Sequence, residues 1–204
     1  MTIRLHSGDL PDLARYKVGA VAIDTETMGL DVRRDRLCVV QLSPGDGSAD
    51  VVQIGPAAAA PKIKALLDDP NILKLFHFGR FDLATLHQAF GVMAGPVYCT
   101  KIASRLSRTY TDRHGLKDLV REVLNIELSK QQQSSDWGAP ALSEAQLAYA
   151  ASDVLHLHAL REKLDAMLAR EGRTELAKAC FEFLPTRARL DLGGWEAEDI
   201  FAHS

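Results

Sequence analysis

The chain has 204 residues, 47% hydrophobic and 25% charged, which is the composition of an ordinary globular protein with length for one domain. Its net charge of −3 argues against a broad electrostatic surface for long nucleic acid, but does not exclude a short one at a local site. No apolar run approaches the roughly 20 residues of a membrane-spanning helix, and the N-terminus lacks signal-peptide features, so no membrane partner is expected.

The first third of the chain predicts strands separated by short loops. Residues 3–6 read as an edge strand, and 20–24, 37–42 and 50–54 read as three more. Short connections between successive strands favour an antiparallel start to the sheet. After an alanine-rich linker, residues 61–68 are expected to form a helix.

From residue 72 onward the pattern alternates strands and helices before becoming helical. Residues 72–76 and 97–99 read as strands, and 80–90 as a helix, ended by Gly91. Everything after Thr100 reads as helix. This order predicts an α/β fold in which helices cover a mixed sheet, with residues 1–204 forming a single domain.

The longest predicted helix begins at Ser143, where Ser143-Glu144-Ala145-Gln146 forms a capping box. Its apolar stripe extends to Met167. Residues 184–204 are too apolar for a free tail, so we expect this segment to dock either on its own core or on a neighbouring subunit. Cys38, Cys99 and Cys180 show no metal-ligand spacing, and because two of them lie in apolar surroundings, buried thiols in a reducing cytoplasm are expected.

Asp24 and Glu26 lie two residues apart at the end of the apolar run Val21-Ala22-Ile23. On a strand, positions i and i+2 share one face, so both carboxylates would project together. Two such anions repel each other unless a proton or a cation joins them, and Mg²⁺ prefers carboxylate oxygens. Taken alone, the pattern is also that of two solvated acids at a strand end.

Two further acids occupy predicted helices. Asp82 lies at the start of the helix at 80–90, where the helix dipole favours a negative charge. Asp153 lies at the edge of the apolar stripe of the long helix, one turn after Tyr149. Singly, each has a structural explanation: a helix-terminal acid, a satisfied buried acid and a core aromatic residue.

Jointly, these residues resemble a known family. Asp24-Thr25-Glu26, His77-x-x-x-Phe81-Asp82 and Tyr149-x-x-x-Asp153 resemble, in this order, the three motifs of the DEDD 3′–5′ exonuclease superfamily, and the tyrosine corresponds to its DEDDy branch. Residues 128–137 (LSKQQQSSDW) and 142–154 are similar to ribonuclease D. The resemblance covers roughly residues 18–165 and implies a ribonuclease H-like mixed sheet flanked by helices.

The resemblance also implies the chemistry. Two divalent ions, Mg²⁺ or Mn²⁺, would lie about 3.5–4 Å apart and hold both oxygens of an in-line displacement at phosphorus. Asp24 would bridge both ions, Glu26 and Asp153 would complete one site, and Asp82 would hold the other through water. Tyr149 would orient the attacking water, although an ordinary tyrosine pKa near 10 makes it a poor base. The implied reaction releases nucleoside 5′-monophosphates from a 3′ end.

Departures from ribonuclease D point to a small substrate. Longer ribonuclease D proteins carry helical HRDC domains after the catalytic one, and none is expected here because the sequence ends at Ser204. Leu30 stands where oligoribonuclease-type enzymes place a leucine that wedges between the last two bases; alternatively, it packs on the core. With residues 109–117 and 195–204, these features are similar to the nano-RNase C family, which implies dinucleotide substrates and an octameric ring.

The remaining substrate-binding candidates are less specific. Arg113, His114 and Lys117 are expected either to cap a terminal 5′-phosphate or to form a solvated loop. His77 would contact a substrate phosphate or cap the following helix, and Thr25 completes the set.

Two rival functions stay open: trimming of longer RNA or DNA 3′ ends, as by ribonuclease D, and a catalytically silent nucleic-acid-binding domain.

Overall fold

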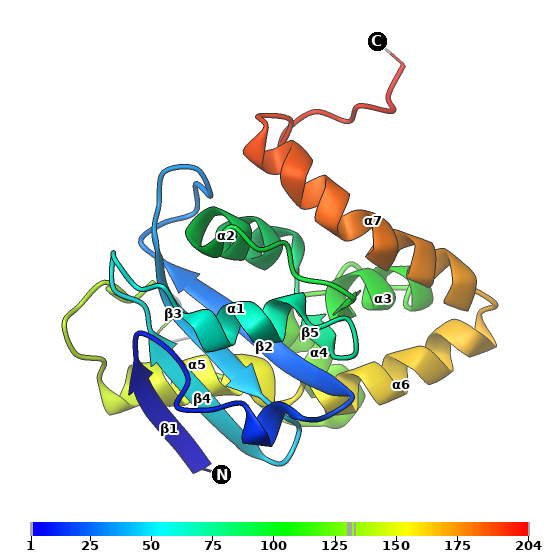
Figure 1. The fold of residues 1–204 in the computed structure, drawn as a ribbon. Coiled ribbons are helices and arrows are strands. Elements are labelled where there is room, and N and C mark those ends of the chain that lie inside the picture. The colour runs from blue at the N-terminus through cyan, green and yellow to red at the C-terminus, as the bar shows by residue number, and fades with distance from the viewer. Residues whose placement is uncertain (1, 130–131, 133, 204) are drawn as a thin grey trace.

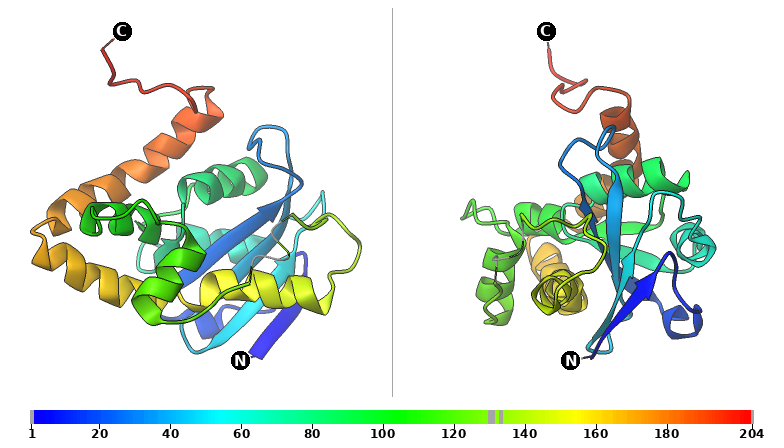
Figure 2. Two further views of the ribbon diagram at one scale, coloured as in Figure 1. Left: turned by 180° about the vertical axis from the view of Figure 1, so that it is seen from behind. Right: turned by 90° about the vertical axis from the view of Figure 1, so that its left-hand side faces the viewer.

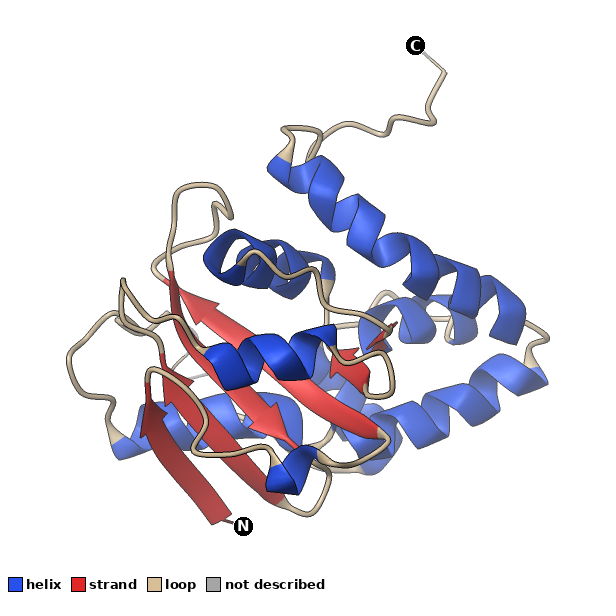
Figure 3. Ribbon diagram, in the orientation of Figure 1, coloured by secondary structure: helices blue, strands red, loops and turns tan. Residues whose placement is uncertain are grey.

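The computed structural model describes residues 2–129, 132 and 134–203. Figures 1 and 3 show its elements along the chain. In order, they are β1 (Thr2–Ser7), a short 3-10 helix (Ala14–Tyr16), β2 (Ala20–Thr27), β3 (Leu37–Ser43), β4 (Ser48–Gln53), α1 (Pro61–Asp68), β5 (Leu73–Phe76), α2 (Arg80–Phe90), β6 (Val97–Cys99), α3 (Thr100–Ser107), α4 (Leu116–Leu124), α5 (Glu144–Leu155), α6 (Leu157–Arg170) and α7 (Thr174–Leu192). The predicted helices at 61–68 and 80–90 and the strand at 97–99 have these bounds.

The described strands form one six-stranded mixed sheet in the order β1-β4-β3-β2-β5-β6. β2 pairs antiparallel with β3, and β3 antiparallel with β4, as the short loops predicted. β1 differs, because it lies parallel to β4 at the sheet edge. β5 and β6 extend the sheet in parallel beyond β2. The end of β2 therefore emerges between two neighbouring strands, in the middle of the sheet.

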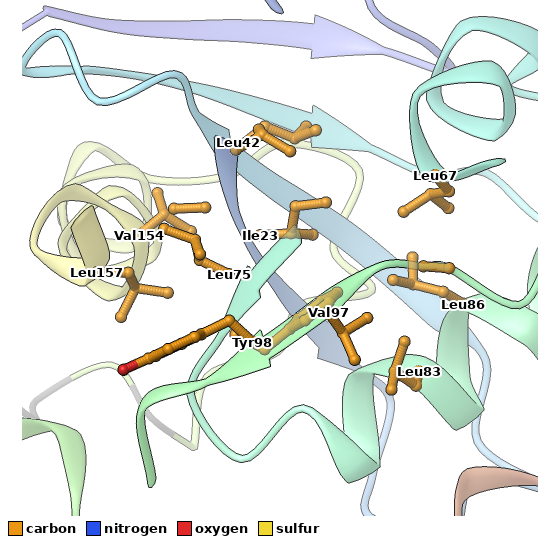
Figure 4. Close-up of a cluster of buried hydrophobic side chains, with 14 of the residues drawn as sticks. Ile23, Leu42, Leu67, Leu75, Leu83, Leu86, Val97, Tyr98, Val154 and Leu157 are labelled. Carbon is orange, nitrogen blue, oxygen red and sulfur yellow. The ribbon is translucent and has the colours of Figure 1, made fainter. Parts of the chain in front are cut away.

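Helices cover both faces of this sheet. Figure 2 shows α1 and α2 on one side and α4 and α5 on the other. The buried core joins Ile23 and Leu42 of the sheet to Leu67 of α1, and Val154 and Leu157 of the opposite layer pack near β5 (Figure 4). Within the described residues, no helix has the length and apolar character needed to cross a bilayer.

The single long helix expected from Ser143 to Met167 is wrong, because α5 ends at Leu155 and α6 begins at Leu157. Between them His156 has φ −105° and ψ −5°, with no glycine or proline to mark the break. α5 packs across β2, β3 and β4, whereas α6 packs against α3, α4 and β5. One straight helix does not follow both surfaces, so packing overrides local helix propensity here.

The prediction of helix throughout the region after Thr100 is also wrong between α4 and α5. Asn125 ends α4 in the left-handed conformation, with φ 57°. The described residues between it and Ser143 form turns, bends and irregular segments. In this stretch Gly138 and Pro140 disfavour helix, and only the capping box at Ser143 restarts one.

The predicted docking segment 184–204 divides into two parts. Residues 184–192 continue α7, where Leu184 and Ala188 are buried. After Leu192 the chain turns back, and the Trp195 amide donates to the Leu190 carbonyl at 2.9 Å.

Arg80 and Arg187 both bind the Asp191 carboxylate, and Arg33 bonds Glu196 at 2.9 Å. These contacts fix the start of the segment, while docking of its exposed end on another subunit stays a prediction.

Candidate active site

Two carboxylates leave the end of the inner strand β2. Val21, Ala22 and Ile23 are fully buried and anchor the strand, and Asp24 and Glu26 follow at alternate positions. They therefore project from the same face of the sheet, which is the face that α5 covers. A register shift between Glu26 and Thr27 then ends the regular pairing with β3.

α5 brings a third carboxylate to this pair. The Ser143 hydroxyl accepts from the Gln146 amide while the Gln146 side chain accepts from the Ser143 amide, so the predicted capping box begins the helix. Two and a half turns further along, Asp153 faces the end of β2. One carboxylate oxygen from each of Asp24, Glu26 and Asp153 lies within 4.8 Å of the others.

Asp82 approaches the same strand end from α2, in the opposite layer. Its side chain is buried, and its Oδ1 accepts a hydrogen bond from the Thr25 hydroxyl at 2.7 Å. Thr25 points to the opposite face from its neighbours Asp24 and Glu26, so it joins Asp82 to the strand that carries them. The structure thus gathers all four predicted acids around the end of β2, with Asp82 just outside the group of three.

The four acids hold their protons much more strongly than free carboxylates do. Burial raises the pKa of Glu26 to about 9, with repulsion from Asp153 and Asp82 as the second cause. The pKa values of Asp82 and Asp153 rise to about 7, again mainly through burial. That of Asp24 rises well above its usual value, because the carboxyl is desolvated and faces the other three acids.

This donor set fits divalent cations. Oxygen ligands from carboxylates are what Mg²⁺ and Mn²⁺ bind in proteins, and a cation replaces the protons that the clustered acids otherwise need. The convergence of three carboxylate oxygens also leaves one central position that all of them reach.

Tyr149 lies one turn before Asp153 on α5. Burial, with repulsion from Asp153, raises the pKa of Tyr149 above that of a free tyrosine, so its hydroxyl stays protonated at neutral pH. The Trp137 ring packs beside it, with the two ring centroids 6.0 Å apart. Tyr149 is therefore held as a hydrogen-bond donor at the edge of the acid cluster.

The acids open into a cleft of 340 Å³. At its acidic end lie Asp24, Glu26, Tyr149 and Asp153, and Leu30 stands at its wall with 87% of its surface exposed. The remaining lining residues are Thr25, Thr27, His77, Phe81, Lys101, Gly115, Leu116, Lys117, Leu128 and Ser129. The cleft thus has carboxylates at one end and two lysines elsewhere on its wall.

Lys101 is a cleft residue that the sequence did not reveal. It is the second residue of α3, and its Nζ lies 4.3 Å from the centroid of the Phe78 ring. Burial and the nearby Arg105 lower its pKa. Nothing in the local sequence distinguishes it from a solvated lysine, because only the pairing of β6 with β5 carries α3 to the cleft.

The predicted basic candidates separate in the structure. Lys117 lines the cleft, but Arg113 and His114 are not among its lining residues. The Arg113 side chain is 67% exposed, and His114 Nδ1 is engaged by the Ser104 hydroxyl at 2.9 Å. The buried guanidinium of Arg108 donates to the Ser104 hydroxyl and to the backbone carbonyl of Arg113 in the same region.

His77 lines the cleft and pairs with α3, since its Nδ1 lies 2.9 Å from the Thr100 hydroxyl. Burial and the charge of Lys101 lower the pKa of His77 to about 3, so the ring is neutral at physiological pH.

Of the sequence segment similar to ribonuclease D, Leu128 and Ser129 line the cleft, whereas residues 130, 131 and 133 lie outside the described part of the chain.

Comparisons with known proteins agree with this geometry. A 3′-5′ exonuclease family matches residues 11–169. Ribonuclease D of Gluconacetobacter diazotrophicus is 36% identical over 155 residues, which are 76% of this chain and 39% of that protein. The chain thus spans about two fifths of the length of the curated relatives that it matches.

Solved structures match over the whole chain. NrnC of Brucella melitensis bound to pGG is 63% identical, covers 100% of both chains and has a TM-score of 0.98. The same protein with bound Mg²⁺ is 62% identical over 100% of both chains, with a TM-score of 0.96. Escherichia coli RNase D is 28% identical, with a TM-score of 0.77, over 86% of this chain and 46% of that one.

Proposed function

Because the chain belongs to the 3′-5′ exonuclease family and has its ribonuclease H-like fold, we propose that it hydrolyses short oligonucleotides, especially dinucleotides, to nucleoside 5′-monophosphates. The observation that carries this proposal is the convergence of Asp24, Glu26 and Asp153 within 4.8 Å of one another at the end of a cleft. The likeness to NrnC bound to pGG supports a dinucleotide as substrate.

Asp24, Glu26 and Asp153 would hold one divalent ion, and Asp82 would help to hold a second. The likeness to NrnC with bound Mg²⁺ supports Mg²⁺ as one of these ions, with Mn²⁺ as the alternative. When bound, the ions supply positive charge that acidifies the attacking water and stabilises the charge that builds up on the phosphate. The protein holds the ion-binding carboxylates in place, because the Thr25 hydroxyl bonds Asp82 and β2 carries Asp24 and Glu26.

Tyr149 orients the attacking water. Its hydroxyl is protonated, because its pKa is raised, and it donates to the Asp153 carboxylate, so it does not act as the base. The packing of Trp137 against its ring restricts its side-chain rotation. The Tyr149 oxygen would accept a hydrogen bond from the water and so align a lone pair of the water with the phosphorus, a positional role for which a neutral hydroxyl is sufficient.

The cleft sets the length of the substrate. Lys101 and Lys117 line the same cleft as the acids, and neither lysine forms an ion pair with a carboxylate among the described residues. We assign them to the 5′-phosphate of a short substrate whose scissile phosphate lies at the acids. Leu30, an exposed apolar side chain at the cleft, would separate the two bases. Thr25 holds Asp82 through its hydroxyl, and His77, whose Nδ1 is engaged by Thr100, lines the cleft where it would contact a substrate phosphate.

The family resemblance of the sequence also supports a proposal for the assembly and the location. We propose a homo-oligomeric ring, in which the exposed Trp195, Ile200 and Phe201 of the C-terminal segment contact neighbouring subunits. The thiols of Cys38 and Cys99 are buried and unpaired, which fits a reducing cytoplasm.

Asp24→Asn tests this function. The variant should lose metal-dependent release of mononucleotides while keeping the circular dichroism spectrum of the wild type, because asparagine is nearly isosteric. Asp68→Asn is a matched control at the exposed end of α1 and should keep full activity. Near-normal turnover by Asp24→Asn would refute the assignment.

A further inference from the structure

Gln41 is a buried side chain without a partner. It lies in the middle of β3 with 0% of its surface exposed. Neither its Oε1 nor its Nε2 has a hydrogen-bond partner among the described residues. A buried primary amide in this state costs free energy that an apolar residue would not, and the flanking positions of β3 are Val40 and Leu42. A specific role for the amide would explain why glutamine stands here.

The register of the sheet places this amide beside the acid cluster. Gln41 is the direct cross-strand partner of Asp24 in the antiparallel pair of β2 and β3. Directly opposed residues project from the same face, with Cβ atoms about 4.5–5.5 Å apart. On its other side Gln41 faces Val51 of β4, which is fully buried and apolar.

α5 covers this face of the sheet and brings Asp153 to the same acid cluster. Of the two residues directly opposite Gln41 in the sheet, Val51 is apolar, so Asp24 is the polar side chain that the register places beside Gln41. One oxygen of Asp24 already accepts from the Thr25 amide, which leaves other acceptor positions on the carboxylate.

We propose that Gln41 is a positioning residue for Asp24: the side-chain amide of Gln41, which has no partner among the described residues, donates a hydrogen bond to the Asp24 carboxylate when that carboxylate binds a divalent ion, and so orients it. The proposal rests on the proposed function, because it assumes that Asp24 binds the ion. A neutral donor suits this place, since it fixes the carboxylate without adding charge. Glutamate at the same position would add a fifth acid to the four already clustered there.

Metal-binding carboxylates generally need such partners, and removing one typically weakens metal affinity by about 10–100-fold. Gln41→Met keeps the length of the side chain but removes the amide. We expect it to weaken Mg²⁺ binding by about this factor, while the melting temperature in chelator stays the same or rises, because an unpaired polar group has been lost.

Thr85→Val is the matched control. Thr85 of α2 is also buried with an unpartnered side-chain oxygen among the described residues, but it lies in the opposite layer from Asp24. This variant also removes an unpaired polar atom from the interior, and its Mg²⁺ affinity should equal that of the wild type.

The experiment is a Mg²⁺ titration by calorimetry and by thermal melting, on wild type, Gln41→Met, Thr85→Val and Asp24→Asn. The positioning role is supported if Gln41→Met binds Mg²⁺ more weakly than the wild type while Thr85→Val does not. Equal Mg²⁺ affinity in Gln41→Met and wild type overturns it. If Asp24→Asn binds Mg²⁺ as wild type does, the proposed metal site itself fails, and this result is distinct from failure of the Gln41 proposal alone.

Discussion

Replacing Asp82 with asparagine should stabilise the metal-free protein in a pH-dependent way. Asp82 is 3% exposed, and burial raises its pKa from 3.8 to about 7. Between these two values the unfolded chain has released the proton while the folded protein keeps it, so the folded state binds more protons and its stability falls as pH rises. Above the folded pKa the full penalty is present.

The penalty can be worked out from this shift. A difference between 3.8 and about 7 corresponds to about 2 kcal/mol at pH 5 and about 4 kcal/mol at pH 8. Asparagine never ionises, so Asp82→Asn should avoid this cost, and its Oδ1 can still accept from the Thr25 hydroxyl. In chelator, its free energy of unfolding should exceed that of the wild type by these amounts.

Urea unfolding in chelator at pH 5 and pH 8, followed by circular dichroism, measures this gap. Saturating Mg²⁺ should remove most of it, because the cation favours the ionised acid in the wild type. A gap that has the same size at both pH values would show that Asp82 is not forced to hold its proton. The account of the clustered acids would then be wrong.

Three further variants test other parts of the site. Lys101→Ala should raise KM for a 5′-phosphorylated dinucleotide by about tenfold with little change in kcat, because one charge-assisted phosphate contact is lost; an unchanged KM would exclude Lys101 from the substrate site. Tyr149→Phe should lower kcat by about 100-fold in steady-state assays while Mg²⁺ affinity stays constant, and full activity would remove Tyr149 from the mechanism. Asp191→Ala should lower the free energy of unfolding by about 2–3 kcal/mol in urea, since Arg80 and Arg187 lose their shared carboxylate, and wild-type stability would contradict that reading.

Part of the acid cluster could be predicted from the sequence, because residue spacing within one strand or one helix determines which side chains share a face. Alternation on a strand places Asp24 and Glu26 together, and helical spacing places Tyr149 and Asp153 on one face. That these two pairs lie next to each other depends on residues far apart in the sequence, so only the family resemblance predicted it. In the structure, α5 packs on β2 and brings the two pairs together.

Other features had no local signal. Lys101 sits on an ordinary short helix, and only the sheet order brings that helix to the cleft. Gln41 is one polar residue in an apolar strand, and its register opposite Asp24 depends on pairing that composition does not specify. The break at His156 lacks glycine and proline, so it follows from the two surfaces that α5 and α6 cover.

The most direct test of the central claim is a time course on 5′-labelled RNA of two to about twenty nucleotides, with Mg²⁺, Mn²⁺ or chelator. The account predicts rapid, metal-dependent conversion of the dinucleotide to mononucleotides, with longer substrates cleaved more slowly, because the acids and the two lysines line one cleft of 340 Å³. Shortening of the long RNA that stalls before the dinucleotide would contradict it.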